Sequence, residues 1–95
     1  MAIQLGLGGN ISFTITGDGS STQLDISLDT LGNFLGFTLP TPASDVDLVN
    51  FSLFTGAPGI TLTPTLINGG TTIRLSFNSA PTNGLNYSVA LRLWA

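Results

Sequence analysis

The 95-residue chain lacks cysteine, histidine, lysine and glutamate, and its only charged residues are five aspartates and two arginines. Without cysteine there is no disulfide, no thiolate nucleophile and no cysteine-based metal site. Without histidine, lysine and glutamate, the usual nucleophile, base and metal-ligand groups cannot be assembled. We therefore expect a protein that is not an enzyme and that carries no cofactor and no metal.

The charge balance also narrows the classes of partner. The net charge is −3, whereas nucleic-acid binding needs a field of lysine and arginine that neutralises phosphates, and an anionic membrane surface attracts basic segments. No apolar run approaches the roughly 20 residues of a membrane helix. The N-terminal residues 1–7 alternate in hydropathy and have no basic start, unlike a signal peptide. We expect synthesis in a cytoplasm, without nucleic-acid or membrane binding.

Hydrophobic residues make up 42% of the chain, which is too many for a disordered polypeptide, and serine, threonine and asparagine replace the missing charges. The apolar residues recur with period two, which is typical of strands. The pattern predicts one domain over residues 1–95, an all-β antiparallel β-sandwich or jelly roll of about eight short strands. A closed barrel is the alternative. The expected strands span residues 3–7, 11–16, 24–29, 34–39, 44–54, 60–66, 73–77 and 87–94.

Turn residues separate these strands. Gly8-Gly9-Asn10 is expected to join the first two strands in a hairpin, and Asn68-Gly69-Gly70 is the strongest hairpin turn in the chain because these residues tolerate positive φ. Pro64 indicates an edge strand or a bulge. Ser44 could instead cap a short helix, but the β-branched and aromatic residues that follow favour a strand.

The aspartates are the remaining candidates for chemistry. Asp25 and Asp29 would share one strand face about 13 Å apart, which is too far for a glycosidase carboxylate pair, so we interpret them as solvated strand residues. Asp18 and the pair Asp45 and Asp47 could offer oxygen ligands to calcium. Because the acidic spacing and closing glutamate of a calcium loop are absent, turn chemistry is the favoured interpretation.

The stretch from Phe34 to Phe37 breaks the two-faced pattern. In a regular strand Leu35 would lie opposite Phe34, and both faces would be apolar. Such a strand is either central in its sheet or in contact with another subunit. Trp94 points away from the apolar face of the last strand, which also favours a contact. The predicted interface residues are Phe34, Leu35, Phe37 and Trp94.

In its size, β content and neutral composition the chain resembles the small decoration, or cement, proteins of tailed-bacteriophage heads. The resemblance implies a structural protein of the virion, assembled in the host cytoplasm, that forms a homo-oligomer, with a trimer favoured, and reinforces a capsid. The alternative is a carbohydrate-binding or adhesive β-sandwich module. Tyr87 and Trp94 would then stack on sugars, or hydroxyl rows would form a flat array, at Ser12, Thr14 and Thr16 and at Thr61, Thr63 and Thr65.

Overall fold

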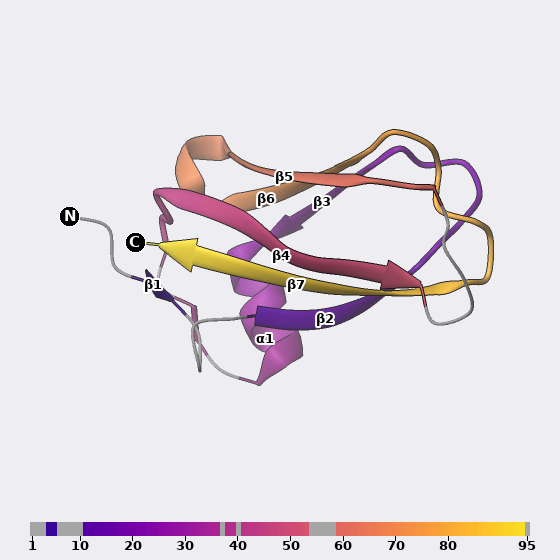
Figure 1. Cartoon of the computed structure of the whole chain (residues 1–95). Coiled ribbons are helices and arrows are strands. Elements are labelled where there is room, and N and C mark those ends of the chain that lie inside the picture. The colour runs from indigo at the N-terminus through magenta and orange to yellow at the C-terminus, as the bar shows by residue number, and fades with distance from the viewer. Residues whose placement is uncertain (1–3, 6–10, 37, 40, 54–58, 95) are drawn as a thin grey trace.

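The structure is a computed structural model that describes residues 4–5, 11–36, 38–39, 41–53 and 59–94 (Figure 1). Within these ranges it is mostly β, with one α-helix. In chain order the elements are β1 (Gln4–Leu5), β2 (Ile11–Thr16), β3 (Gln23–Ser27), α1 (Leu28–Leu35), β4 (Asp45–Leu53), β5 (Leu62–Ile67), the 3₁₀ turn η2 (Asn68–Gly70), β6 (Thr72–Phe77) and β7 (Asn86–Trp94).

Two antiparallel sheets face each other in a sandwich-like arrangement (Figure 1). In the first sheet, β7 is central, with β4 on one side and with β1 and β2 in succession on the other. In the second sheet, β6 lies between β3 and β5. The strands β2 and β3 are therefore outermost on one side of the molecule, and β4 and β5 lie close together on the other.

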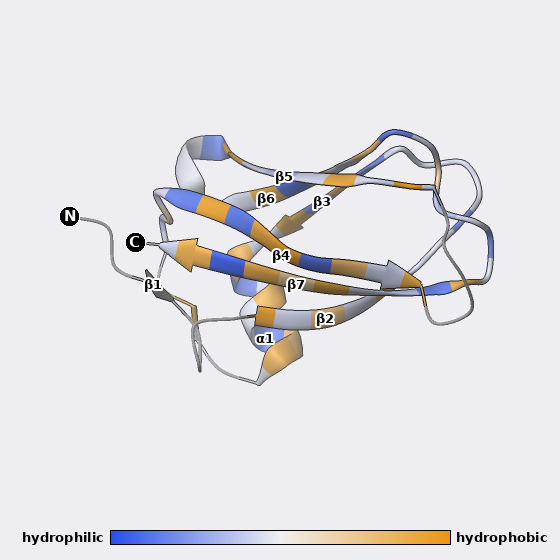
Figure 2. Cartoon of the chain, viewed as in Figure 1, coloured by the Kyte–Doolittle hydropathy of each residue, from blue (hydrophilic) through white to orange (hydrophobic). Residues whose placement is uncertain are grey.

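One hydrophobic core fills the space between the sheets, as the period-two pattern predicted. Along β7, Tyr87, Val89, Leu91 and Leu93 are buried while the residues between them are half-buried on the outer face. Figure 2 shows this alternation of hydrophobic and hydrophilic residues along β4 and β7. The other buried core residues of the strands are Ile11, Phe13, Ile15, Val46, Leu62, Ile73 and Leu75.

A bulge in β4 explains why the sequence of that strand changes phase. Val46 and Leu48 pair with inward residues of β7, and so do Phe51 and Leu53, although Phe51 follows Leu48 by three positions, an odd offset that would turn it to the opposite face of a regular strand. The register shifts between Leu48 and Asn50, which leaves one extra residue, Val49, in β4. The bulge thereby returns the apolar residues to the core face. The predicted strand at residues 44–54 is confirmed for residues 45–53.

The hairpin predicted around Asn68-Gly69-Gly70 is also confirmed, because η2 joins β5 to β6 in register. Gly70 has a φ of 89°, and a Cβ there would collide with the backbone carbonyl of Ala43. The Ala43 N–H donates to the Gly70 carbonyl at 2.8 Å. Pro64 lies in β5, which is an edge strand, as predicted.

Two predictions about the strands were wrong. The first two strands do not form a hairpin: β1 and β2 both run antiparallel to β7, so they point in the same direction. The C-terminal strand has taken the position that a hairpin partner would occupy, a long-range pairing that local turn chemistry does not reveal. The expected turn at residues 8–10 lies outside the described residues. The predicted strand at residues 34–39 is replaced in part by α1, and the described residues hold seven strands instead of about eight.

Candidate interaction surface

Helix α1 begins and ends at recognisable capping residues. The Ser27 hydroxyl accepts a hydrogen bond from the Thr30 N–H at 3.1 Å, so Ser27 is the N-cap. Gly36 adopts a left-handed φ of 87° and closes the C-terminal end. The segment between these two caps forms two turns of helix, where the pattern predicted the end of one strand, a break, and the start of the next.

The spacing of the apolar residues is the signal that the period-two interpretation missed. Leu28, Leu31 and Leu35 are spaced three and four apart, which places them on one helix face. Leu28 and Leu31 are buried, and Leu35 is half-buried against the core. Phe34 lies outside this face and is 70% exposed. Phe34 and Leu35 were predicted on opposite faces of a strand; they lie instead in a helix, where Leu35 packs against the core and Phe34 faces solvent.

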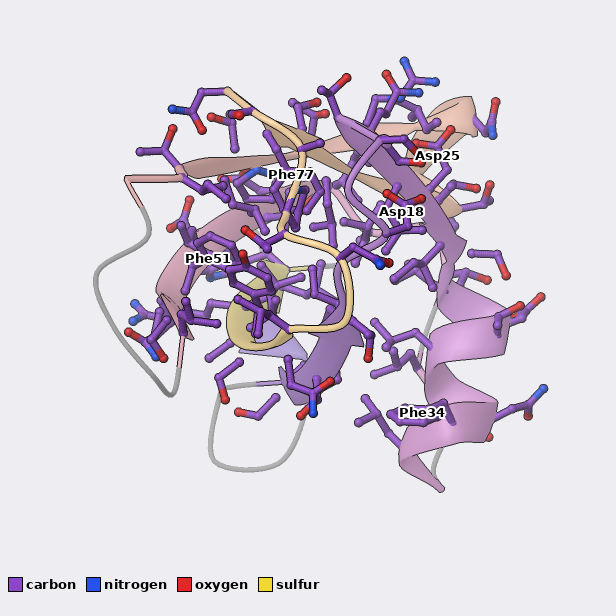
Figure 3. All side chains as sticks on the ribbon, turned by 90° about the vertical axis from the view of Figure 1, so that its right-hand side faces the viewer. Asp18, Asp25, Phe34, Phe51 and Phe77 are labelled. Atoms are coloured by element: carbon purple, nitrogen blue, oxygen red, sulfur yellow. The ribbon has the colours of Figure 1, made fainter. Side chains whose placement is uncertain are left out.

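An open apolar groove lies on the side of the sandwich where β2 and β3 are outermost. Helix α1 runs along this side (Figures 1 and 3), and Phe34 projects from it beside the sheet that contains β2 (Figure 3). The groove has a volume of about 280 Å³ and is open to solvent. Its lining carries no charge and consists of Phe13, Thr14, Ile15, Leu24, Ile26, Thr30, Leu31 and Phe34.

The two sides of the sandwich differ in how their edge strands are protected. Edge strands are normally blunted by bulges, prolines or charges, which prevent pairing with another chain. On the β4 and β5 side, β4 carries its bulge at Val49 and β5 carries Pro64. On the opposite side, β2 is regular over six residues and contains no proline and no charged residue. The groove therefore adjoins β2, an edge strand without these three features, although β3 on the same side carries Asp25 and α1 runs along that side.

The other predicted interface residues lie elsewhere or cannot be placed. Trp94 is half-buried on the outer face of the first sheet, as predicted from its opposition to Leu93. The guanidinium carbon of Arg92 lies 6.0 Å from the centre of the Trp94 ring. Trp94 does not line the groove that Phe34 lines, so the two residues belong to separate surfaces. Phe37 lies outside the described residues.

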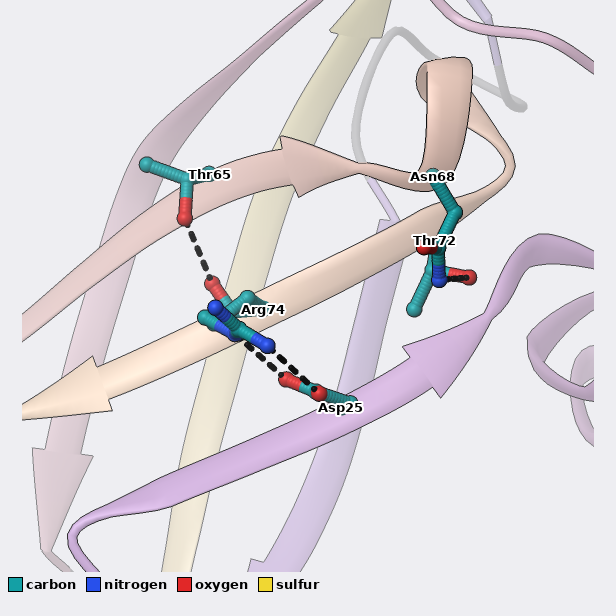
Figure 4. A network of polar contacts seen from close by, with 5 residues as sticks. All are labelled: Asp25, Thr65, Asn68, Thr72 and Arg74. Atoms are coloured by element: carbon teal, nitrogen blue, oxygen red, sulfur yellow. Dashed lines mark hydrogen bonds and ion pairs between the residues drawn. The ribbon is translucent and has the colours of Figure 1, made fainter.

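The outer face of the second sheet is held by one ion pair (Figure 4). Arg74 in β6 donates from Nε to Oδ1 of Asp25 in β3 at 3.0 Å, and from Nη2 to Oδ2 at 3.1 Å. The hydrogen bonds from Arg74 lower the pKa of Asp25 below its ordinary value, and Asp25 in turn raises the pKa of Arg74. Asp25 thus lies on a solvated strand face, as predicted, whereas Asp29 lies in the first turn of α1.

The Asp18 carboxylate organises the turn between β2 and β3. It accepts hydrogen bonds from the Ser21 hydroxyl at 2.6 Å and from the N–H groups of Ser20 and Ser21. These bonds, that of the Ser21 hydroxyl foremost, hold the pKa of Asp18 well below its ordinary value. This geometry agrees with the predicted turn chemistry. Among the described residues no three acidic side chains gather in a possible metal site.

Comparison of the chain with models of protein families, with curated proteins and with solved structures finds no match. Within the described ranges, no helix has the length and apolar character needed to span a membrane. Of the surfaces described above, the groove is the one that contains the most exposed large hydrophobic side chain, that of Phe34.

Proposed function

We propose that the protein is a non-enzymatic structural subunit that associates with itself and with a larger assembly, in the manner of the decoration proteins of phage-like virions. The observation that carries the proposal is the exposed Phe34 beside an uncharged apolar groove. Large exposed apolar features mark interaction sites in folded proteins. The jelly-roll connectivity, the trimeric state and the virion location remain part of this proposal.

The surface chemistry supports association with another protein more than binding of a small molecule. Small-molecule sites are concave and bury most of their ligand, whereas this groove is open and shallow enough to leave Phe34 70% exposed. The described aspartates with lowered pKa are engaged in a turn and in an ion pair, where they stay ionised as hydrogen-bond acceptors. These positions suit a protein whose polar groups maintain the fold and whose apolar edge makes the contact.

A direct test is the size of the purified protein in solution. We expect the molar mass from light scattering and sedimentation to rise above the monomer mass of 9.8 kDa as the protein concentration increases. A protein that stays monomeric at every concentration and that binds a defined glycan on an array would contradict the proposal.

A carbohydrate-binding or adhesive module is the second candidate, and one observation favours it. On the outer face of the first sheet, Trp94 lies beside Arg92, with Asp45 and Asp47 directly opposite them on β4. Aromatic faces and planar polar side chains are common in sugar sites. The hydroxyl rows favour it less, because the row on β2 and the row on β5 belong to different sheets. Glycan-array binding that is lost in Trp94→Ala would support this candidate.

A further inference from the structure

We infer that the groove between β2, β3 and α1 is a two-fold contact between two copies of this chain, in which Phe34 of each copy seats in the groove of the other. This inference rests on the proposed function, since it names the surface through which the subunit meets itself. It commits to a second copy as the occupant of the groove.

The groove and the side chain that would fill it belong to the same patch. Phe34 is the most exposed large hydrophobic residue among those described, at 70%, and Leu24 at the other side of the groove is 39% exposed. A closed two-fold contact uses the same patch on both subunits, so the patch must fit itself. An exposed aromatic ring beside an apolar hollow of about 280 Å³ meets this requirement.

The distribution of charge also fits a second copy. A two-fold axis brings residues of the patch close to their own copies, so any charge in the patch would face a like charge. No charged residue lines the groove. A basic partner would have no carboxylate to bind there, although the protein as a whole has a net charge of −3. The uncharged lining therefore permits self-contact and gives a basic partner no advantage.

The protection of the edges favours a closed pair over an open chain of subunits. Head-to-tail growth would need the β4 and β5 side of one copy to receive the β2 and β3 side of the next. That receiving side carries the bulge at Val49 and the proline at position 64, both of which block strand-edge association. These two features disfavour a head-to-tail contact through the β4 and β5 side.

The area of the patch determines how tight the pair is. A phenylalanine has about 200 Å² of surface, so Phe34 at 70% exposed and Leu24 at 39% exposed offer on the order of 200 Å² of apolar area per copy. Even with a polar rim, the total is well below the roughly 1,600 Å² of a stable interface. We expect a weak pair with a dissociation constant between about 10 µM and 1 mM. Repetition of the contact within an assembly would strengthen it.

The first arm of the test is sedimentation of the full chain over this concentration range. Phe34→Ala is expected to lower the association constant at least about tenfold, because each pair buries two such rings. The matched control is Asn33→Ala, which removes an exposed polar side chain from the adjacent position of α1 and should leave the association constant within about twofold. Circular dichroism of both variants verifies that α1 is retained.

The second arm uses the absence of cysteine from the chain, so that a single introduced thiol reports on one place. Thr14→Cys lies in the groove on β2, and the control Thr63→Cys is exposed on the outer face of β5. With a short bis-maleimide reagent, the Thr14→Cys variant should give covalent dimers several times faster than the control, and adding Phe34→Ala should remove the difference.

The outcomes separate the inference from the proposed function. If an oligomer forms but is unchanged in Phe34→Ala, or if both cysteine variants cross-link equally, the two-fold contact is refuted while the assembly role stands. If the protein remains monomeric up to about 1 mM and neither variant cross-links, both the contact and self-association are refuted. Loss of association in Phe34→Ala together with selective cross-linking through position 14 supports the contact.

Discussion

Leu31 and Phe34 lie three residues apart on the same helix, and replacing each with alanine should separate folding from contact. Leu31 is 2% exposed, so its truncation leaves a cavity in the core and should cost about 3 kcal/mol of unfolding free energy. Phe34 is 70% exposed, and covering the remainder of a ring of about 200 Å² contributes at most about 1.5 kcal/mol. The better helix propensity of alanine offsets about 0.5 kcal/mol of this loss of unfolding free energy.

The expected loss for Phe34→Ala is therefore about 1 kcal/mol, one-third of that for Leu31→Ala. Urea denaturation followed by tryptophan fluorescence measures both, at protein concentrations of about 1 µM, where a weak pair is dissociated. Equal losses for the two variants would show that Phe34 belongs to the core, and the assignment of the exposed patch would fail.

Three further predictions concern the fold. Tyr87→Phe should cost about 1 kcal/mol of unfolding free energy, because the Tyr87 hydroxyl accepts a hydrogen bond from the Thr82 N–H at 3.0 Å; a loss below about 0.3 kcal/mol in chemical denaturation would show that this bond is unimportant. Gly70→Ala should destabilise by more than 2 kcal/mol because its Cβ meets a backbone carbonyl, whereas Gly69→Ala, with open space but a φ of 69°, should cost only about 1 kcal/mol; equal melting temperatures for the two would contradict this. The folded-state pKa of Asp18 lies below its unfolded value of about 3.9, so the stability that its carboxylate contributes is present above pH 4 and is lost as the pH falls further. The unfolding free energy of Asp18→Asn should therefore fall less steeply with decreasing pH than that of the wild type. The same dependence on acid pH in both proteins would refute the assignment.

The parts of the fold that depend on short-range patterns could be predicted from the sequence. The alternation along residues 86–94 and the turn at Asn68-Gly69-Gly70 act within a few residues, and both were found where they were expected. The bulge at Val49 could not be placed, because it shows itself only when β4 is paired with β7. The pairing of β1 and β2 with β7 likewise depends on a partner 70 or more residues away in the chain.

The candidate site likewise combines features that short-range sequence patterns indicate with features that depend on the tertiary structure. Phe34 was singled out because apolar residues fell on both faces of an expected strand, and the structure places it as an exposed residue of α1. Ser27, Gly36 and the leucine spacing between them carried the helix signal, but the alternation from Leu24 to Leu28 overlapped with it. The groove itself combines side chains from β2, β3 and α1, which only the tertiary structure brings together.

Density-gradient fractionation of the protein in extracts of its native source tests the assembly role most directly. A specific antibody follows the chain across the gradient, and a purified sample run in parallel marks the position of the free protein. If the protein is a subunit of a larger particle, most of it migrates with fast-sedimenting material, and the purified Phe34→Ala variant competes for that position less well than the wild type. Recovery of all the protein at the position of the free chain, with no displacement by added wild type, would contradict the account.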